Sequence, residues 1–136
     1  MARIVLTNAS VVFGTSNDLS DHIANLSIST SYDIVETTAF GNVAKTRIAG
    51  LQDNSVTFEF HQDFASGSVE SIVYPLLGTA ITIKVKPDAG ATSATNPQYS
   101  FSALISEWTP LSGGVGELST ASVTWPISGA ITKTTA

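Results

Sequence analysis

The chain has 136 residues, of which 43% are hydrophobic, 12% are charged and none is cysteine. This size fits one compact domain over residues 1–136, and the absence of cysteine excludes disulfides and thiolate metal sites and fits synthesis in a reducing compartment. The formal net charge of -5 argues against gripping contact with nucleic acid, which requires Lys and Arg against phosphates. Because the charged fraction is about half that of a typical soluble protein, we expect neighbouring subunits to cover much of the surface.

Strands are predicted from the N-terminus onwards. Residues 3–13 can form one or two strands, and their apolar run at 4–6 is too short for a signal peptide or a membrane span. Strict alternation over 26–32 and again over 56–61 predicts strands with one buried and one polar face, and 34–38 adds another. The chain therefore begins as an all-β protein.

A long loop is predicted over 39–54, with its contact segment at about 38–50. This segment holds two of the six basic residues of the chain together with exposed-looking apolar side chains. Loops of this length and composition typically make contacts, although Phe40 and Ile48 tucking under the core is an equally good interpretation.

One helix is predicted over 68–77, because its apolar residues fall at helical spacing. Ser66 and Ser68 are candidate caps, and Gly78 follows the end. Pro75 removes one backbone donor, so we expect a distorted last turn.

The C-terminal half alternates again, which predicts strands over 81–86, 99–105 and 118–127, with a loop at 88–97. Trp108 and Trp125 could form an aromatic platform for sugars, but core packing is the stronger interpretation on alternating strand faces.

No catalytic, cofactor or metal site is predicted. His22 and His61 lie near Asp21 and Asp63 in sequence, but neither neighbourhood supplies the three or four ligands that zinc requires. No serine lies in a Gly-x-Ser-x-Gly elbow. Glycines 113, 114 and 116 precede a strand instead of opening a helix, so they predict a turn and not a phosphate-binding loop. An enzyme is therefore not expected.

Taken together, the chain resembles the major tail tube proteins of long-tailed bacteriophages, particularly short versions from phages of actinobacteria. The likeness covers nearly the whole chain and lies in the order and combination of several stretches. These stretches are 18–22, 35–41 leading into 47–51, 75–79, 94–97, 110–116 and 123–126.

The resemblance implies a β-sandwich or half-barrel with one flanking helix, assembling into hexameric rings that stack into a tube through which the genome passes without specific binding. It implies a tape measure protein and tail terminator or tip proteins as further partners, no membrane, synthesis in the cytoplasm of the bacterial host and a final place in the virion tail. The contact loop would then reach the neighbouring ring. Its contact residues would be Thr38, Phe40, Lys45, Arg47 and Ile48.

The polar strand faces are the candidates for the lumen of such a tube. The candidate lumen residues are Ser27, Ser29, Thr57, Glu59, Thr82 and Thr124. Lys84 and Lys86 do not suit a channel that must not hold DNA, so their face is expected to point outward or to pair with acidic neighbours. A capsid decoration protein or another small phage structural protein is the main alternative, and a carbohydrate-binding module is the second.

Overall fold

The computed structural model describes residues 3–135 and is built almost entirely of strands. In chain order the elements are β1 (Ser10–Phe13), β2 (Asn17–Asp18), the 3-10 helix η1 (Ser20–His22), β3 (Ile23–Glu36), β4 (Arg47–His61), α1 (Val69–Val73), the 3-10 helix η2 (Tyr74–Leu76), β5 (Ala80–Lys86), β6 (Gln98–Leu104) and β7 (Thr120–Thr134). The prediction of an all-β fold with one helix is confirmed. No helix within residues 3–135 is long and apolar enough to cross a membrane.

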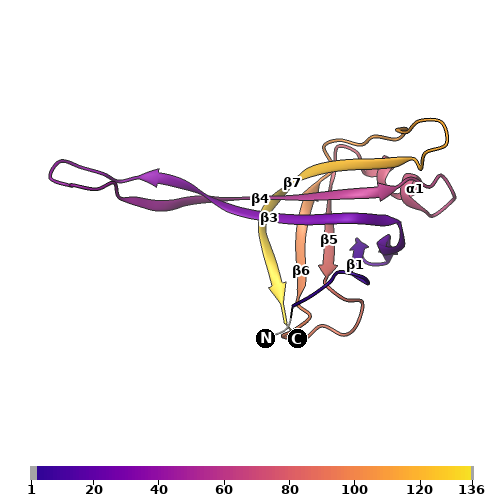
Figure 1. Cartoon of the computed structure of the whole chain (residues 1–136), viewed down its shortest axis with the longest axis horizontal. Helices are drawn as coiled ribbons and strands as arrows, with labels where there is room; N and C mark the ends of the chain where they lie inside the picture. Colours follow the sequence, from indigo (N-terminus) through magenta and orange to yellow (C-terminus); the bar gives the residue numbers. More distant parts are fainter. Residues whose placement is uncertain (1–2, 136) are drawn as a thin grey trace.

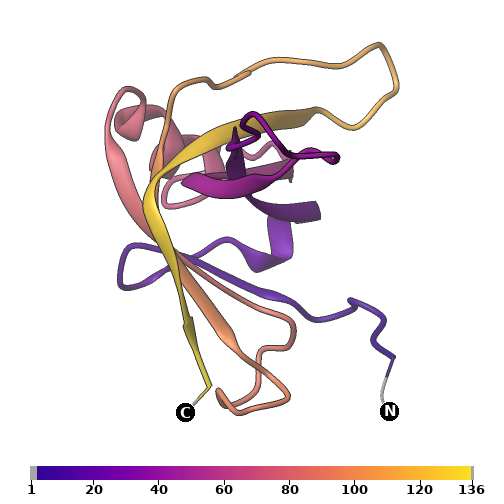
Figure 2. The same cartoon turned by 90° about the vertical axis from the view of Figure 1, so that its left-hand side faces the viewer.

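All seven strands belong to one sheet with the order β2-β1-β5-β6-β7-β4-β3, and every neighbouring pair is antiparallel. Strand β7 joins the two halves of this sheet, because its first part pairs with β4 and its last part pairs with β6. The two parts meet at Ile127, and the strand bends close to this point, where Gly129 has a φ of 89°, a conformation that favours glycine. The sheet therefore curves around its own core as a half-barrel (Figures 1 and 2).

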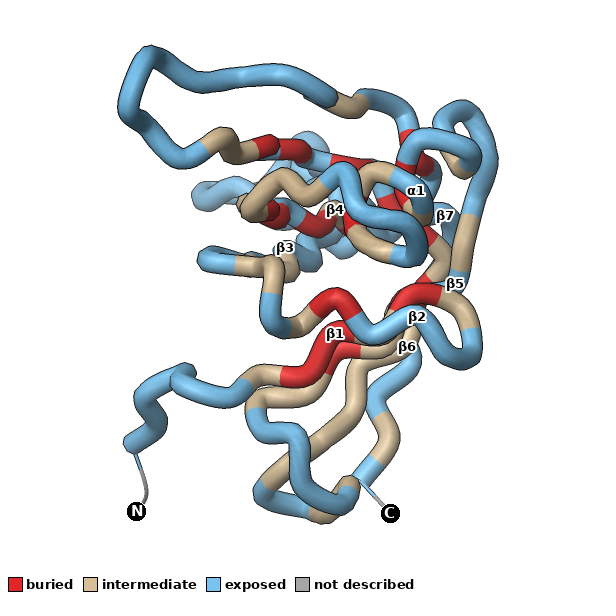
Figure 3. Tube along the Cα trace, turned by 90° about the vertical axis from the view of Figure 1, so that its right-hand side faces the viewer, coloured by how far each residue is buried: buried red, intermediate tan, exposed pale blue. Residues whose placement is uncertain are grey.

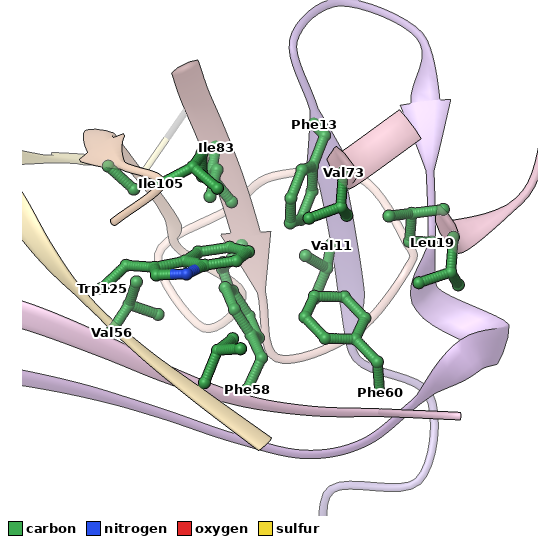
Figure 4. Close-up of a cluster of buried hydrophobic side chains, with 14 of the residues drawn as sticks. Val11, Phe13, Leu19, Val56, Phe58, Phe60, Val73, Ile83, Ile105 and Trp125 are labelled. Atoms are coloured by element: carbon green, nitrogen blue, oxygen red, sulfur yellow. The ribbon is translucent and has the colours of Figure 1, made fainter. Parts of the chain in front are cut away.

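The core lies on the concave side of the curved sheet, where β1 and β5 face β4 and β7 (Figure 4). Its centre is aromatic, with Phe13 and Trp125 at a ring distance of 6.0 Å and Phe58 and Phe60 at 5.5 Å. All four side chains are fully buried. Burial of this much aromatic surface is the main stabilising contribution of a small β domain.

The predicted helix is present in two parts. Helix α1 buries Val69 and Val73 against the core, and η2 follows it around Pro75 as a tighter 3-10 turn. Ser68 stands at the N-cap position, but its hydroxyl donates to Asp63 instead of capping the helix. The missing donor of the proline accounts for the change to a 3-10 turn.

Residues 3–13 form one strand, Ser10–Phe13, which is the lower of the two predicted numbers. Two other local predictions were wrong. Half of the loop predicted over 39–54 is strand, because β4 begins at Arg47, and the connecting loop is confined to 37–46. A bulge opposite Asp33 breaks the two-residue alternation of β4 near Gly50, which hid this strand from pattern analysis. The last strand continues seven residues beyond the predicted end at 127.

Candidate assembly interface

A two-stranded arm projects from the body of the protein (Figure 1). It consists of residues 31–53, where β3 and β4 pair only with each other, because the pairing of β4 with β7 stops at Asn54. Its long strands extend to one end of the longest axis of the molecule, while the core lies near the other end. No residue of the arm is buried, so the arm contributes no side chain to the core. The buried residues lie in the body of the protein (Figure 3).

Both faces of the arm carry exposed apolar side chains. Tyr32 and Ile34 lie on one face, and they are 58% and 73% exposed. Val35 and its cross-strand partner Ile48 lie on the other face and are also exposed. A projecting ribbon that is apolar on both faces gains stability only when other molecules cover it.

The tip of the arm, residues 37–47, is held in one shape by its own hydrogen bonds. The backbone N–H of Thr37 donates to the carbonyl of Thr46, and the N–H of Thr46 donates to Thr38 Oγ1 at 3.0 Å. Phe40 and Val43 are nevertheless fully exposed. An ordered turn that holds an aromatic side chain in solvent is typical of a contact site.

All five predicted contact residues lie on the arm. Phe40, Arg47 and Ile48 are exposed, Lys45 Nζ lies 3.8 Å from Glu36 Oε1, and Thr38 supports the turn. The exposed apolar residues Val43 and Leu51 lie within the loop predicted over 39–54, whereas Tyr32, Ile34 and Val35 are exposed apolar residues of the same arm that were not predicted as contacts. The adjacent pair Ile34 and Val35 was the available signal, because a strand with one polar face does not place two apolar residues next to each other.

Five of the six predicted lumen residues share one polar face. On the convex side of the sheet, Ser27 lies opposite Thr57, and Thr57 lies opposite Thr124, so the three form one row across β3, β4 and β7. Thr57 and Thr124 share a hydrogen bond of 3.1 Å between their hydroxyl groups. Ser29 and Glu59 occupy the neighbouring rows of the same face. The whole face, in residues 25–33, 53–61 and 120–126, has no Lys or Arg.

Thr82 does not belong to this polar face. It lies on β5, whose alternation places it on the same side as Lys84 and Lys86, while Ile83 points into the core. Strand β5 faces β4 across the core, so its outer surface points away from the face that holds Ser27 and Thr57. Both outer surfaces carry serines and threonines, since Thr82 lies opposite Ser102 and Lys84 opposite Ser100, and they differ in charge because the lysines lie only on the surface of β5 and β6.

Strand β3 forms one edge of the sheet. It has 14 residues and pairs with β4 on one side, and no strand among residues 3–135 pairs with its other side. Long unprotected edges are templates for pairing with another chain. The polar face and the arm therefore adjoin an edge that can continue the sheet into a neighbouring subunit.

His22 ties two loops together at the end of the body opposite the arm. Its Nδ1 lies 2.8 Å from Asp21 Oδ1, and its Nε2 lies 2.9 Å from Asp63 Oδ2. The hydrogen bond with Asp21 raises the pKa of His22, and the backbone N–H of Ala65 lowers the pKa of Asp63. No group of three or more His, Cys, Asp or Glu side chains within residues 3–135 could hold a metal ion. The arrangement is a structural bridge between η1 and the loop before α1.

The two tryptophans do not form a platform. Trp125 is fully buried and donates from Nε1 to the carbonyl of Glu107. Trp108 packs edge-on against Phe60 at 5.4 Å and donates to Glu70 Oε2 at 2.7 Å. The core interpretation of Trp125 is confirmed, and the geometry gives no support to a carbohydrate-binding surface built on both rings.

The comparisons with known proteins identify the fold. The chain matches no protein-family model and no curated protein. It is similar to a chain in the virion of a native gene transfer agent particle, with a TM-score of 0.68 and 13% identity over 91% of this chain and 95% of that chain. It is also similar to a chain in the C6-symmetric tail of an empty gene transfer agent particle, with a TM-score of 0.62 and 16% identity over 95% of both chains.

A third similar chain comes from the 6-fold symmetrised baseplate of an anti-feeding prophage. Its TM-score is 0.55 and its identity 11%, and the match covers 99% of this chain and 98% of that chain. The protein therefore has a fold that is found in phage-tail-like particles.

Proposed function

We propose that the protein is the tail tube subunit of a long-tailed phage or a phage-like particle. In this proposal six copies form a ring, and rings stack into a hollow tube in the virion tail through which the genome passes. The observation that carries it is the arm, which exposes apolar side chains on both faces and buries none of them against its own chain. The likeness to a chain of a C6-symmetric tail supports the same conclusion.

The free edge of β3 supports ring formation. Pairing of this edge with a neighbour would extend the sheet from subunit to subunit and would satisfy the backbone groups that are unpaired in the single chain. Six repeats of such a head-to-tail contact close into a ring, whereas the stacking of rings is open-ended. A separate protein, such as a tape measure with its terminator, would then have to set the length of the tube.

The polar face of β3, β4 and β7 is the proposed wall of the channel. Its serine and threonine rows offer hydrogen bonds, and its formal charges come from Asp33, Asp53 and Glu59. An acidic wall repels the phosphates of DNA and lets the polyanion slide, whereas lysines would hold it. Ser27, Ser29, Thr57, Glu59 and Thr124 are the proposed lumen residues, and Thr82 is left out because it lies with Lys84.

Electron microscopy of the purified full chain over a range of protein concentrations tests the proposal. We expect hollow tubes with six subunits per ring. A variant in which residues 33–51 are replaced by a two-residue turn between the paired residues Tyr32 and Gln52 should keep the fold and form no tubes, because its inter-ring contacts are removed. Monomers or trimers at every concentration of the unaltered protein would contradict the proposal and favour a capsid decoration protein.

A further inference from the structure

The tip of the arm carries a small excess of positive charge. Residues 37–47 include Lys45 and Arg47 and no Asp or Glu. The adjoining Glu36 lies 3.8 Å from Lys45 Nζ and opposite Arg47, so residues 36–47 have a formal charge of +1. Phe40 and Val43 stand between the ends of this segment with their side chains in solvent. A partner for the tip should therefore combine exposed apolar side chains with an excess of carboxylates.

The opposite end of the molecule has this combination. We call it the loop end and define it as residues 14–22, 62–68 and 106–119, which together contain no Lys or Arg. Its acidic residues are Asp18, Asp21, Asp63, Glu107 and Glu117. Its exposed large apolar residues are Phe64, Leu111, Val115 and Leu118.

Hydrogen bonds join the three segments of the loop end into one surface. Gln62 donates from its backbone to the carbonyl of Ser119 and from its side chain to the carbonyl of Pro110. His22 bridges to Asp63. The loop end is thus an ordered surface on which carboxylates and apolar side chains have fixed relative positions.

The two surfaces lie at opposite ends of the longest axis of the protein (Figure 1). The seven residues from Arg47 to Asp53 extend the arm by roughly 23 Å at the usual rise of a strand, which carries the tip well away from the body. In a stack of rings that all point the same way, one end of each subunit meets the other end of a subunit in the next ring.

We infer that the loop end is the receiving surface for the arm tip of a copy in the next ring. Lys45 and Arg47 of the tip face the carboxylates of the loop end, and Phe40 and Val43 pack against its apolar side chains. The inference rests on the proposed function and adds to it the partner surface of the arm. The polarity of the tube follows from it, because each ring presents basic tips on one side and acidic loop ends on the other.

Charge reversal at each end, singly and together, tests the inference in the full-length protein. Lys45→Glu with Arg47→Glu reverses the tip, and Asp21→Lys with Glu117→Lys reverses the loop end. Each pair should raise the protein concentration needed for tube growth about tenfold or more, since like charges then face each other at six positions around each ring. The variant with all four changes should form tubes near the concentration of the unaltered protein. The measurement is light scattering, with electron microscopy of the same samples.

Lys84→Glu with Lys133→Glu is the matched control, because it changes the net charge as much as the tip reversal does but lies outside both surfaces. It should leave the concentration for tube growth unchanged. The inference would be overturned if this control raised the concentration for tube growth as much as the tip reversal does. It would also be overturned if the variant with four changes did not form tubes near the concentration of the unaltered protein. Tubes formed by the unaltered protein would leave the proposed function standing in either case.

Crosslinking gives a second test that needs no charge change. The chain has no cysteine, so Val43→Cys places the only thiol at the arm tip, where a photoreactive maleimide can be attached. In assembled tubes, irradiation should join this position to peptides from 62–68 or 106–119 of another copy. Crosslinks to β5, β6 or a second arm tip would overturn the inference.

Discussion

The two halves of strand β4 differ in the burial of their side chains. From Asn54 to His61 it is a central strand, and its inward side chains Val56, Phe58 and Phe60 are fully buried. From Arg47 to Asp53 it belongs to the arm, where Ile48 and Leu51 are 59% and 81% exposed. Both halves pair with the same neighbour, β3, over almost their full length.

The difference between the halves comes from the strand on their other side. Strand β7 pairs with β4 as far as Asn54 and then bends at Gly129 to continue along β6. Asn54 marks this corner, because its buried amide donates from Nδ2 to the carbonyl of Gly129 at 3.0 Å. Beyond the corner nothing in the same chain covers the arm, so hydrophobic side chains remain available for other subunits.

The largest effect is expected from one substitution made in both regions. Phe58→Ala in the body should lower the free energy of unfolding by about 3–5 kcal/mol, because it removes a fully buried ring from the aromatic core. Phe40→Ala at the arm tip should change it by less than about 0.5 kcal/mol, because that ring makes no intramolecular contact with the core. Urea denaturation of the monomers measures both. Equal losses would mean that the arm folds back on the body in solution.

A smaller effect is expected at the corner between the two regions. Gly129→Ala should lower the free energy of unfolding by about 1–2 kcal/mol, because an L side chain is strained at positive φ while no atom crowds its Cβ. Gly78→Ala has a similar positive φ and the same open space in an exposed turn, so its loss should be similar.

The two glycine variants should differ in assembly. A changed bend in β7 would alter the direction of the arm, so Gly129→Ala should also impair tube formation, and Gly78→Ala, which lies outside both the arm tip and the loop end, should do so less. Identical assembly of both variants by electron microscopy would show that the corner does not orient the arm.

The smallest effect is expected from the histidine bridge at the loop end, and it depends on pH. The pKa of His22 is raised, so its contribution to stability is fully present below 6.5 and is lost as the pH rises through its folded value. The pKa of Asp63 is lowered, so its contribution is present above 3.8 and is lost as the pH falls through its folded value. Both contributions are therefore present between these two limits.

His22→Gln should consequently lower the melting temperature more at about pH 5.5 than at about pH 8. Thermal unfolding followed by circular dichroism at the two pH values measures the difference. His61→Gln is the control, because His61 lies on the polar face of β4 without such a bridge. If His22→Gln lowers the melting temperature equally at both pH values, the charged bridge is contradicted.

Pattern analysis predicts the body of this protein better than its arm. Two-residue alternation of apolar and polar residues indicates a strand with one buried face. It predicted β5, β6 and the central parts of β3 and β4. The arm half of β4 lacks this alternation, since it buries neither face and contains a bulge near Gly50. It was therefore predicted as a loop, although its role as a contact segment was proposed from its basic and apolar residues.

The prediction of the candidate channel face from the sequence was limited in a similar way. Alternation places Ser27, Ser29, Thr57 and Glu59 on the polar sides of their strands, and pairing in the sheet then brings them together. The same rule places Thr82 on a polar side, but it cannot tell that β5 lies across the core with its polar side facing the opposite way. The curvature of the sheet, set by the bend of β7 at Gly129, decides this and has no periodic signal.

The unpaired edge of β3 also determines how the protein behaves before assembly. The free edge has 14 residues without Lys or Pro, and its two charged residues, Asp33 and Glu36, both lie on the arm. Between its two register shifts the edge is therefore open to pairing with another strand. Under the proposed function, this edge is open to pairing in each single subunit. We expect growth to follow nucleation kinetics, with a lag that shortens when preformed rings are added, so that the start of each tube, and not the supply of subunits, controls how many tubes a cell makes.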